Sequence, residues 1–269
     1  MNGLRHYLLA VQYFTRIPVT GAVAAWVGYS PQMLRASAAH FPGVGLLVGL
    51  MAAFAYGVVM WALPQNAHAG GYAALVAAVL STGFTVFMTG AFHEDGLADV
   101  ADGLGGSAER QRALEIMKDS RVGAFGAIAV ALMLMAKVAL LGLLGSIDVA
   151  LACAGLLAAH VASRAFPLLL VRALPHVGDE GASKSKPVAD QIGNTALLAA
   201  SAWLAAGLGL ACLFIDGMQV LAGVAFAGLA WLWMWRLFSR RLQGFTGDCL
   251  GATQQACEVA FYFGLAVAA

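Results

Sequence analysis

Charged residues are scarce in this chain. Asp, Glu, Lys and Arg together make up 11% of its 269 residues, whereas 61% of the residues are hydrophobic. Soluble domains carry about 25% charged residues, so this scarcity, with a mean hydropathy of +0.80, excludes an ordinary water-soluble domain. The formal net charge is +1, and we expect no nucleic-acid partner.

Two further patterns are missing. The N-terminus reaches Arg16 and Pro18 after a short apolar stretch, without the small-residue pattern of a signal-peptide cleavage site. The stretch Leu4–Phe14 instead predicts an amphipathic helix on the membrane surface. The four cysteines show no CxxC spacing, so we interpret them as packing residues within the membrane.

The chain does contain a series of apolar runs, each near the length of about 20 residues that a membrane-spanning helix needs. Ala and Gly are abundant in them, as expected where helices pack closely in lipid, and none alternates like a barrel strand. We predict an all-α, polytopic helical bundle in which residues 1–269 form a single membrane-embedded domain. The predicted spans are 41–62, 71–92, 123–145, 149–171, 194–215, 218–238 and 250–268.

Lys and Arg are absent from alternate connections between these spans, near 63–70, 146–148 and 216–217. The positive-inside rule places the other connections, which contain Lys and Arg, in the cytoplasm. This predicts seven spans with a cytoplasmic N-terminus. Any chemistry is expected on the cytoplasmic face, where nucleotides and Mg²⁺ are available.

The densest cluster of charge directly follows the second predicted span. Asp95, Asp99 and Asp102 recur at i, i+4 and i+7, so on a helix their side chains fall within an arc of about 60°. Their mutual repulsion, roughly a few tenths of a kcal/mol per adjacent pair, indicates that a cation belongs among them. Hard oxygen ligands favour Mg²⁺ or a similar ion, and hence a phosphate-bearing substrate. The alternative is a solvated loop of mixed charge laced with salt bridges.

The predicted cytoplasmic loop, 93–122, continues beyond these aspartates. After Gly105-Gly106-Ser107 comes an amphipathic segment, 108–120, rich in Arg, Lys and Glu. Carboxylates would bind metal, and Arg or Lys would bind phosphate oxygens. His93 is open to three readings: a general base, a ligand or a structural residue. Glu94 projects about 100° from Asp95 on a helix and is least expected to share its ion.

Charges within or beside the other spans are harder to interpret. Asp248 directly precedes the last predicted span and is either a site residue or an acid facing the helix dipole. Arg164 lies in the fourth span, so it should face the interior and pair with an acid or an anionic ligand. Lys137 either does the same or snorkels to the surface. Glu258 is a candidate counter-ion for either cation.

Several short segments together resemble the cobalamin synthase family, the adenosylcobinamide-GDP ribazoletransferases. They extend over most of the chain, and the aspartate block with its Lys-Asp-Ser-Arg partner is specific. These segments are Phe14–Val19, Phe41–Gly45, Thr89–Asp99, Asp102-Gly103, Ile116–Gly123, Ser163-Arg164 and Thr246–Ala252.

The resemblance implies the last joining step of coenzyme B12 assembly. Adenosylcobinamide-GDP and α-ribazole, or its 5′-phosphate, would give adenosylcobalamin, or its phosphate, and GMP. It also implies Mg²⁺ dependence and a multi-pass protein of the bacterial cytoplasmic (inner) membrane. Association with a second copy or with other B12-assembly enzymes is left open.

The same resemblance suggests roles for the charged residues. The metal ligands would be Asp95, Asp99 and Asp102, and the phosphate would be bound by Lys118 and Arg121. Further ligands, or a base for the attacking hydroxyl, would be Asp119 and Asp248. His93 and Arg164 are the remaining candidates for substrate contact.

Two rival functions remain for the same sequence. A lipid phosphotransferase with a CDP-linked donor would also bind a metal ion through aspartates. It should, however, show a strict arrangement of four aspartates with an intervening Ala-Arg, and this arrangement is absent here. A transporter would use Lys137, Arg164 and Glu258 on an ion or substrate path, and would leave the aspartates unexplained. The segment 172–191 is interpreted as a polar loop, with a lid over the corrinoid as the alternative.

Overall fold

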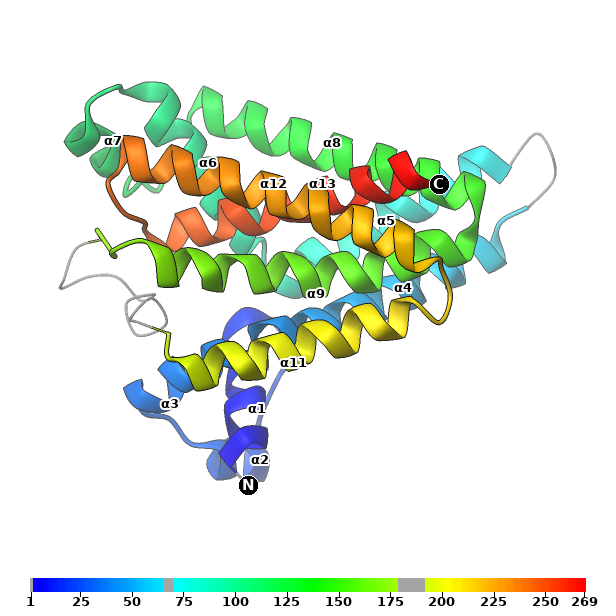
Figure 1. The fold of residues 1–269 in the computed structure, drawn as a ribbon, viewed down its shortest axis with the longest axis horizontal. Coiled ribbons are helices and arrows are strands. Elements are labelled where there is room, and N and C mark those ends of the chain that lie inside the picture. The colour runs from blue at the N-terminus through cyan, green and yellow to red at the C-terminus, as the bar shows by residue number, and fades with distance from the viewer. Residues whose placement is uncertain (1, 65–69, 179–191) are drawn as a thin grey trace.

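The structure is a computed structural model that describes residues 2–64, 70–178 and 192–269. Within these ranges the chain forms helices, and the β-type pairing is an isolated bridge between His176 and Phe245. Six helices are long and apolar enough to cross a membrane. The predicted all-α, multi-span bundle is confirmed (Figure 1), while the side on which the N-terminus lies stays a prediction.

The helices follow one another along the chain without an intervening sheet. Their bounds are α1 (Asn2–Phe14), α2 (Gly21–Val27), α3 (Pro31–Ser37), η1 (Ala38–His40), α4 (Phe41–Ala62), α5 (Gly70–Thr89), α6 (Phe92–Gly106), α7 (Arg110–Ile116), α8 (Ala124–Ile147), α9 (Val149–Ala173), α11 (Asn194–Ala211), α12 (Gly217–Arg241) and α13 (Gly247–Ala268).

Helices occupy all seven positions at which spans were predicted, but α13 is not among the six candidate spans. It packs against α12, α6 and α9, and Figure 1 shows it behind α12. Its polar side chains Gln254, Gln255 and Glu258 are buried, each 2% exposed or less. The last helix is therefore an interior element, and its polar side chains face protein. These polar residues lower its mean hydropathy below that of a lipid-facing span.

The second predicted span ends earlier than expected. Helix α5 ends at Thr89, and α6 begins at Phe92. Between them Gly90 and Ala91 have positive φ angles of 69° and 57°. A side chain on Gly90 would also meet Arg16, with its Cβ 2.9 Å from the guanidinium Nε. This left-handed turn, which disfavours residues other than glycine, separates the aspartate helix from the span before it.

The centre of the bundle is built from closely approaching helices. In the most apolar stretch of helix α9, 72% of the residues are buried, whereas the corresponding share is 22% for α8 and for α12. It packs along α4, where Gly49 lies so close that a Cβ would stand 2.9 Å from the Cα of Leu157. Small residues thus allow the backbones to meet, as their abundance in the spans predicted.

The N-terminal segment is helical, as predicted, and forms α1. It packs against α3 and α4, and Figure 1 shows it beneath the long helices and across their direction. Its location on the membrane surface stays a prediction. The interpretation of 172–191 as a loop or lid falls mostly on 179–191, which lie outside the described residues.

Candidate active site

The aspartate motif is helical rather than an open loop, because residues 92–106 form α6 and 110–116 form α7. Helix α6 packs directly on α13. A Cβ on Gly96 would stand 2.8 Å from the carbonyl oxygen of Asp248, and a Cβ on Gly251 would stand 3.2 Å from that of His93. These two glycines let the backbones cross, and the crossing brings the start of α13 beside the aspartates of α6.

The crossing concentrates negative charge. Burial and the neighbouring charges of Asp248, Asp95 and Asp102 raise the pKa of Asp99 to about 7. Burial also raises the pKa of Asp248 to about 6, although a hydrogen bond from the Thr246 hydroxyl, 3.2 Å from Oδ2, lowers it. A carboxylate pKa is raised in this way when like charges face one another in a partly dry site. Such a site favours a cation.

Asp102 has a further, local role. Its Oδ2 accepts a hydrogen bond from the backbone N–H of Gly123 at 2.7 Å, and its Oδ1 accepts one from Gly126 at 2.8 Å. It thereby caps the first turn of α8, where a negative charge also faces the positive end of the helix dipole. A carboxylate oxygen has a second lone pair, so the predicted metal contact stays a prediction beside this capping role.

The donor types fit Mg²⁺, although the side chains do not form a finished cage. In the described ranges no three His, Cys, Asp or Glu side chains stand close enough together to hold an ion. Mg²⁺ in proteins is usually bound through one or two carboxylates together with waters and substrate phosphates. The facing carboxylates Asp99 and Asp248, with Asp95 nearby, supply that number of hard oxygen donors.

A polar cavity of about 550 Å³ adjoins Asp102. Arg121 lies at its wall and pairs with Asp119, with 2.6 Å between Nη2 and Oδ2. Hydrogen bonds from Arg121 lower the pKa of Asp119 to about 2. Arg112 pairs with Glu115 at 3.0 Å. Both pairs are exposed to solvent, so the two guanidinium groups can exchange these carboxylates for phosphate oxygens at little cost. Exposed Lys118 follows α7 directly.

The charges inside the bundle belong to a separate buried network. Lys137 pairs with Glu258, with 2.5 Å between Nζ and Oε1. Glu258 also accepts hydrogen bonds from Tyr262 at 3.1 Å and Gln254 at 2.6 Å. Gln254 in turn donates to Ser163 at 3.0 Å. Of the two cations proposed as partners of Glu258, the ion pair is therefore with Lys137.

Arg164 faces the interior, as expected, and is 1% exposed. Its Nη1 lies 3.0 Å from the carbonyl oxygen of His160 and 2.9 Å from that residue's Nδ1. Its guanidinium carbon also lies 5.8 Å from the centroid of the Phe41 ring. The structure does not bring Arg164 to the carboxylate crossing, and its predicted contact with substrate stays a prediction.

The buried network reaches α6 through Glu94. Gln255 donates to Glu94 Oε1 at 3.0 Å and to Gln254 Oε1 at 2.9 Å. Glu94 thus faces a different environment from Asp95, in agreement with the expectation that it does not share the same ion. Gln254, Gln255 and His160 were not among the residues predicted from the sequence to have a role. Their signal was the presence of amide and imidazole side chains inside otherwise apolar runs.

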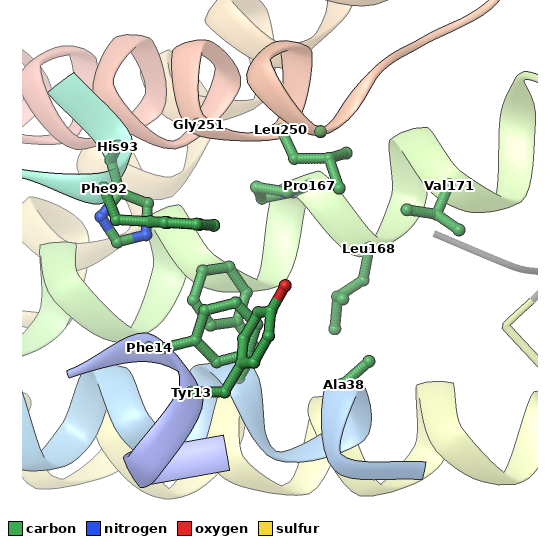
Figure 2. A pocket seen from close by; sticks show the side chains of 12 residues that line it. Tyr13, Phe14, Ala38, Phe92, His93, Pro167, Leu168, Val171, Leu250 and Gly251 are labelled. Carbon is green, nitrogen blue, oxygen red and sulfur yellow. The ribbon is translucent and has the colours of Figure 1, made fainter. Parts of the chain in front are cut away.

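An apolar recess lies on the N-terminal side of the crossing (Figure 2). Its walls include His93, which is 2% exposed and stacks on Phe41 with 5.8 Å between ring centroids. Burial lowers the pKa of His93 well below its usual value. Its Nε2 is buried without a hydrogen-bond partner among the described residues. His93 is therefore a neutral ring at the edge of the site. Its predicted roles as a ligand and as a structural residue both fit this position.

Known proteins resemble this chain over nearly its whole length. A family model described as cobalamin-5-phosphate synthase matches residues 6–266. An adenosylcobinamide-GDP ribazoletransferase from Polaromonas sp. (strain JS666) is 60% identical, with 98% of this chain and 97% of the relative covered. A protein of the same name from Albidiferax ferrireducens is 58% identical over 98% of each chain. The same name belongs to a Shewanella amazonensis protein that is 39% identical over 96% of this chain and 94% of its own length. No solved structure matches. The chain belongs to the cobalamin-5-phosphate synthase family.

Proposed function

We propose that this protein is an adenosylcobinamide-GDP ribazoletransferase, which carries out the final joining step of cobalamin synthesis. The observation that carries this proposal is the match over nearly the whole chain to relatives that bear this name. The acceptor is α-ribazole or its 5′-phosphate, and the second product is GMP.

The reaction is a displacement at phosphorus. The ribose hydroxyl of the acceptor attacks the phosphate that is attached to the cobinamide. A new P–O bond forms, the bridging P–O bond of the diphosphate breaks, and GMP leaves with the bond's electron pair. The hydroxyl proton passes to a base or to water. No covalent link to the protein is required, so positioning and charge are the protein's contributions.

We propose that Asp95 and Asp99 hold Mg²⁺, with Asp248 and Asp102 as the further ligands within reach. Mg²⁺, when bound, would offset negative charge on the diphosphate. Support comes from the raised carboxyl pKa values at the crossing, since a cation relieves that repulsion. Of the two residues predicted as a base, Asp248 is the better candidate, because it lies at the crossing, whereas hydrogen bonds from Arg121 lower the pKa of Asp119 to about 2.

The diphosphate would lie in the polar cavity beside α6. Arg121 and Arg112 stand at its wall, and Lys118 is close in sequence. Their positive charge would bind the phosphate oxygens of the GDP group and stabilise the departing GMP. Because Lys and Arg gather at this end, we propose that the site faces the cytoplasm and that the protein lies in the bacterial inner membrane.

The far side of α6 offers a contrasting surface. A cavity of about 620 Å³ is lined by apolar residues of α6, α8, α12 and α13, among them Leu97, Leu132 and Trp233. A helix between a polar cavity and an apolar one suits a substrate that joins a charged diphosphate to a large body. This arrangement supports the proposed donor over a small soluble phosphate ester.

The test is a Mg²⁺-dependent assay on protein purified in detergent. The substrates are adenosylcobinamide-GDP and α-ribazole, and GMP and cobalamin are followed by chromatography. Asp95→Asn is run in parallel, with Asp216→Asn as the matched control. Asp216 caps α12 at the end remote from Asp248, and Asn caps helices equally well.

We expect product from the wild type and from Asp216→Asn, and none from Asp95→Asn. Full activity in Asp95→Asn would remove this residue from the metal site while leaving the function in place. No product from folded wild-type protein, with both substrates and Mg²⁺ present, would overturn the proposed reaction.

A further inference from the structure

We propose that the apolar recess at the α6–α13 crossing is the subsite for the aromatic base of ribazole. The inference rests on the proposed function and assigns one of its substrates to a place. The recess is formed where α1, η1, α4, α6, α9 and α13 meet, and Figure 2 shows the side chains around it.

The recess is lined almost entirely by apolar groups, and four of its residues are aromatic: Tyr13, Phe14, Phe41 and Phe92. Offset and edge-on ring contacts already hold these side chains together; Phe14 and Phe92, for example, meet edge-on with 5.9 Å between centroids. Aromatic walls favour a flat aromatic occupant, because its faces and edges can make the same contacts.

One polar atom stands in this wall without a partner. His93 is 2% exposed, and its Nε2 has no hydrogen-bond partner in the described part of the chain. A buried polar atom in that state lowers stability until something bonds to it. As an N–H donor, Nε2 can bind one ring nitrogen of an occupant that fills the recess.

The base of ribazole matches this pattern. It is a benzimidazole with two methyl groups, planar and largely apolar. One of its ring nitrogens is bonded to the ribose, and the other carries a free lone pair. Guanine, the base of the other substrate, presents several donors and acceptors. Most of those would remain unpaired against walls whose side chains, in the described part of the chain, offer one unpaired buried polar atom, and each unpaired group opposes binding.

The position of the recess suits the acceptor. Its lining residues Gly247 and Gly251 bracket Asp248 on the first turn of α13. His93 lies two residues before Asp95 on α6. A ribose attached to a base in this recess would therefore lie beside the carboxylate crossing, where its hydroxyl must lose a proton.

The recess must widen to take the base. The free space in the recess is about 30 Å³, which is room for water but not for a two-ring base. Phe92 is 41% exposed and precedes His93, so it is the side chain that can turn outward with least loss of packing. Binding of the base would therefore require the recess to open at this rim.

The experiment measures binding rather than turnover. Equilibrium dialysis compares α-ribazole with an analogue whose free ring nitrogen is replaced by CH. We expect the wild type to bind α-ribazole at least tenfold more tightly than the analogue. His93→Phe, which keeps the ring and removes the nitrogen, should bind the two equally. His6→Phe, a histidine outside the recess, should behave as wild type.

A second variant tests the location independently. Leu250→Trp should fill the recess and weaken α-ribazole binding at least tenfold, while binding of adenosylcobinamide-GDP stays unchanged. Equal binding of both nucleosides by the wild type, or a tenfold preference retained in His93→Phe, would overturn the subsite. If product still forms in that case, the proposed function stands; if the wild type forms no product, the function fails separately.

Discussion

Two groups of carboxylates lie on the same pair of helices, and their surroundings differ. In the buried network, Glu258 pairs with Lys137 and Glu94 accepts a hydrogen bond from Gln255. At the crossing, the charged neighbours of Asp99 are Asp248, Asp95 and Asp102, and together with burial all three raise its pKa. Each carboxylate of the first group has a partner within the protein, whereas those of the second face one another and favour a cation from outside.

The change occurs between neighbouring residues. Glu94 and Asp95 are adjacent on α6, and a helix turns them about 100° apart. One side of α6 therefore belongs to the interior that holds the helices in register, and another belongs to the site. The comparison predicts that changes in the network cost stability, while changes at the crossing cost activity.

The largest expected effect is at the crossing. Asp99→Asn removes one proposed ligand and one repelling charge. Turnover should fall by about 10³-fold or more, the size of effect seen when a group that stabilises developing charge is lost. The melting temperature should stay the same or rise, because repulsion is relieved. A large fall in the melting temperature would show that Asp99 supports the fold instead.

The opposite pattern is expected in the network. Glu258→Leu leaves Lys137 buried without its ionic partner, which should destabilise the protein by about 3–5 kcal/mol. Adding Lys137→Met should recover much of this loss, because an apolar pair of similar volume is tolerated in place of a buried ion pair. Unfolding in detergent or mixed micelles measures both. No recovery in the double variant would mean that the charges do more than neutralise each other.

Arg121 should have a smaller effect on activity than Asp99. Arg121→Ala should raise the KM for adenosylcobinamide-GDP about tenfold, in line with a charge-assisted hydrogen bond of roughly 1.5–3 kcal/mol. Its pair with Asp119 is exposed, so the stability of the fold should not change measurably. An unchanged KM would remove this arginine from the phosphate site.

A further expected effect is a pH dependence of stability without metal. The pKa of Asp99 is about 7 and that of Asp248 about 6 in the folded protein, whereas an unfolded Asp titrates near 3.9. Between these values the folded state binds more protons, so the metal-free protein should lose stability as pH rises from about 4 to 7. Mg²⁺ should weaken this trend. Melting curves at several pH values, with Mg²⁺ or with EDTA, provide the check.

The sequence could predict what depends on local spacing. The i, i+4, i+7 spacing predicted that Asp95, Asp99 and Asp102 share one face if they lie on a helix, and α6 is that helix, although the segment was predicted as part of a loop. It could not predict that Asp102 caps α8, because the two donors, Gly123 and Gly126, lie beyond an intervening helix. That contact depends on how the chain folds back, which no local pattern specifies.

Contacts between distant segments were also beyond the sequence. From the sequence, Asp248 was equally well explained as an acid facing the helix dipole and as a site residue. Only the crossing of its backbone with Gly96 shows that it faces Asp99. Gln254 and Gln255 read as isolated polar residues until α13 is seen to be buried against α6 and α9. The same burial explains why α13 contains polar residues that a lipid-facing span would not.

The division between a metal-binding crossing and a buried network is tested most directly by measuring metal binding to three proteins: wild type, Asp95→Asn and Glu94→Gln. Mn²⁺ can replace Mg²⁺, and its electron paramagnetic resonance signal reports free ion during a titration. The two substitutions remove neighbouring charges from the same helix, so they are matched. The account predicts that Asp95→Asn weakens Mn²⁺ binding at least tenfold, while Glu94→Gln binds as wild type because Gln255 remains its partner. Equal weakening in both variants, or in neither, would contradict the division between site and network.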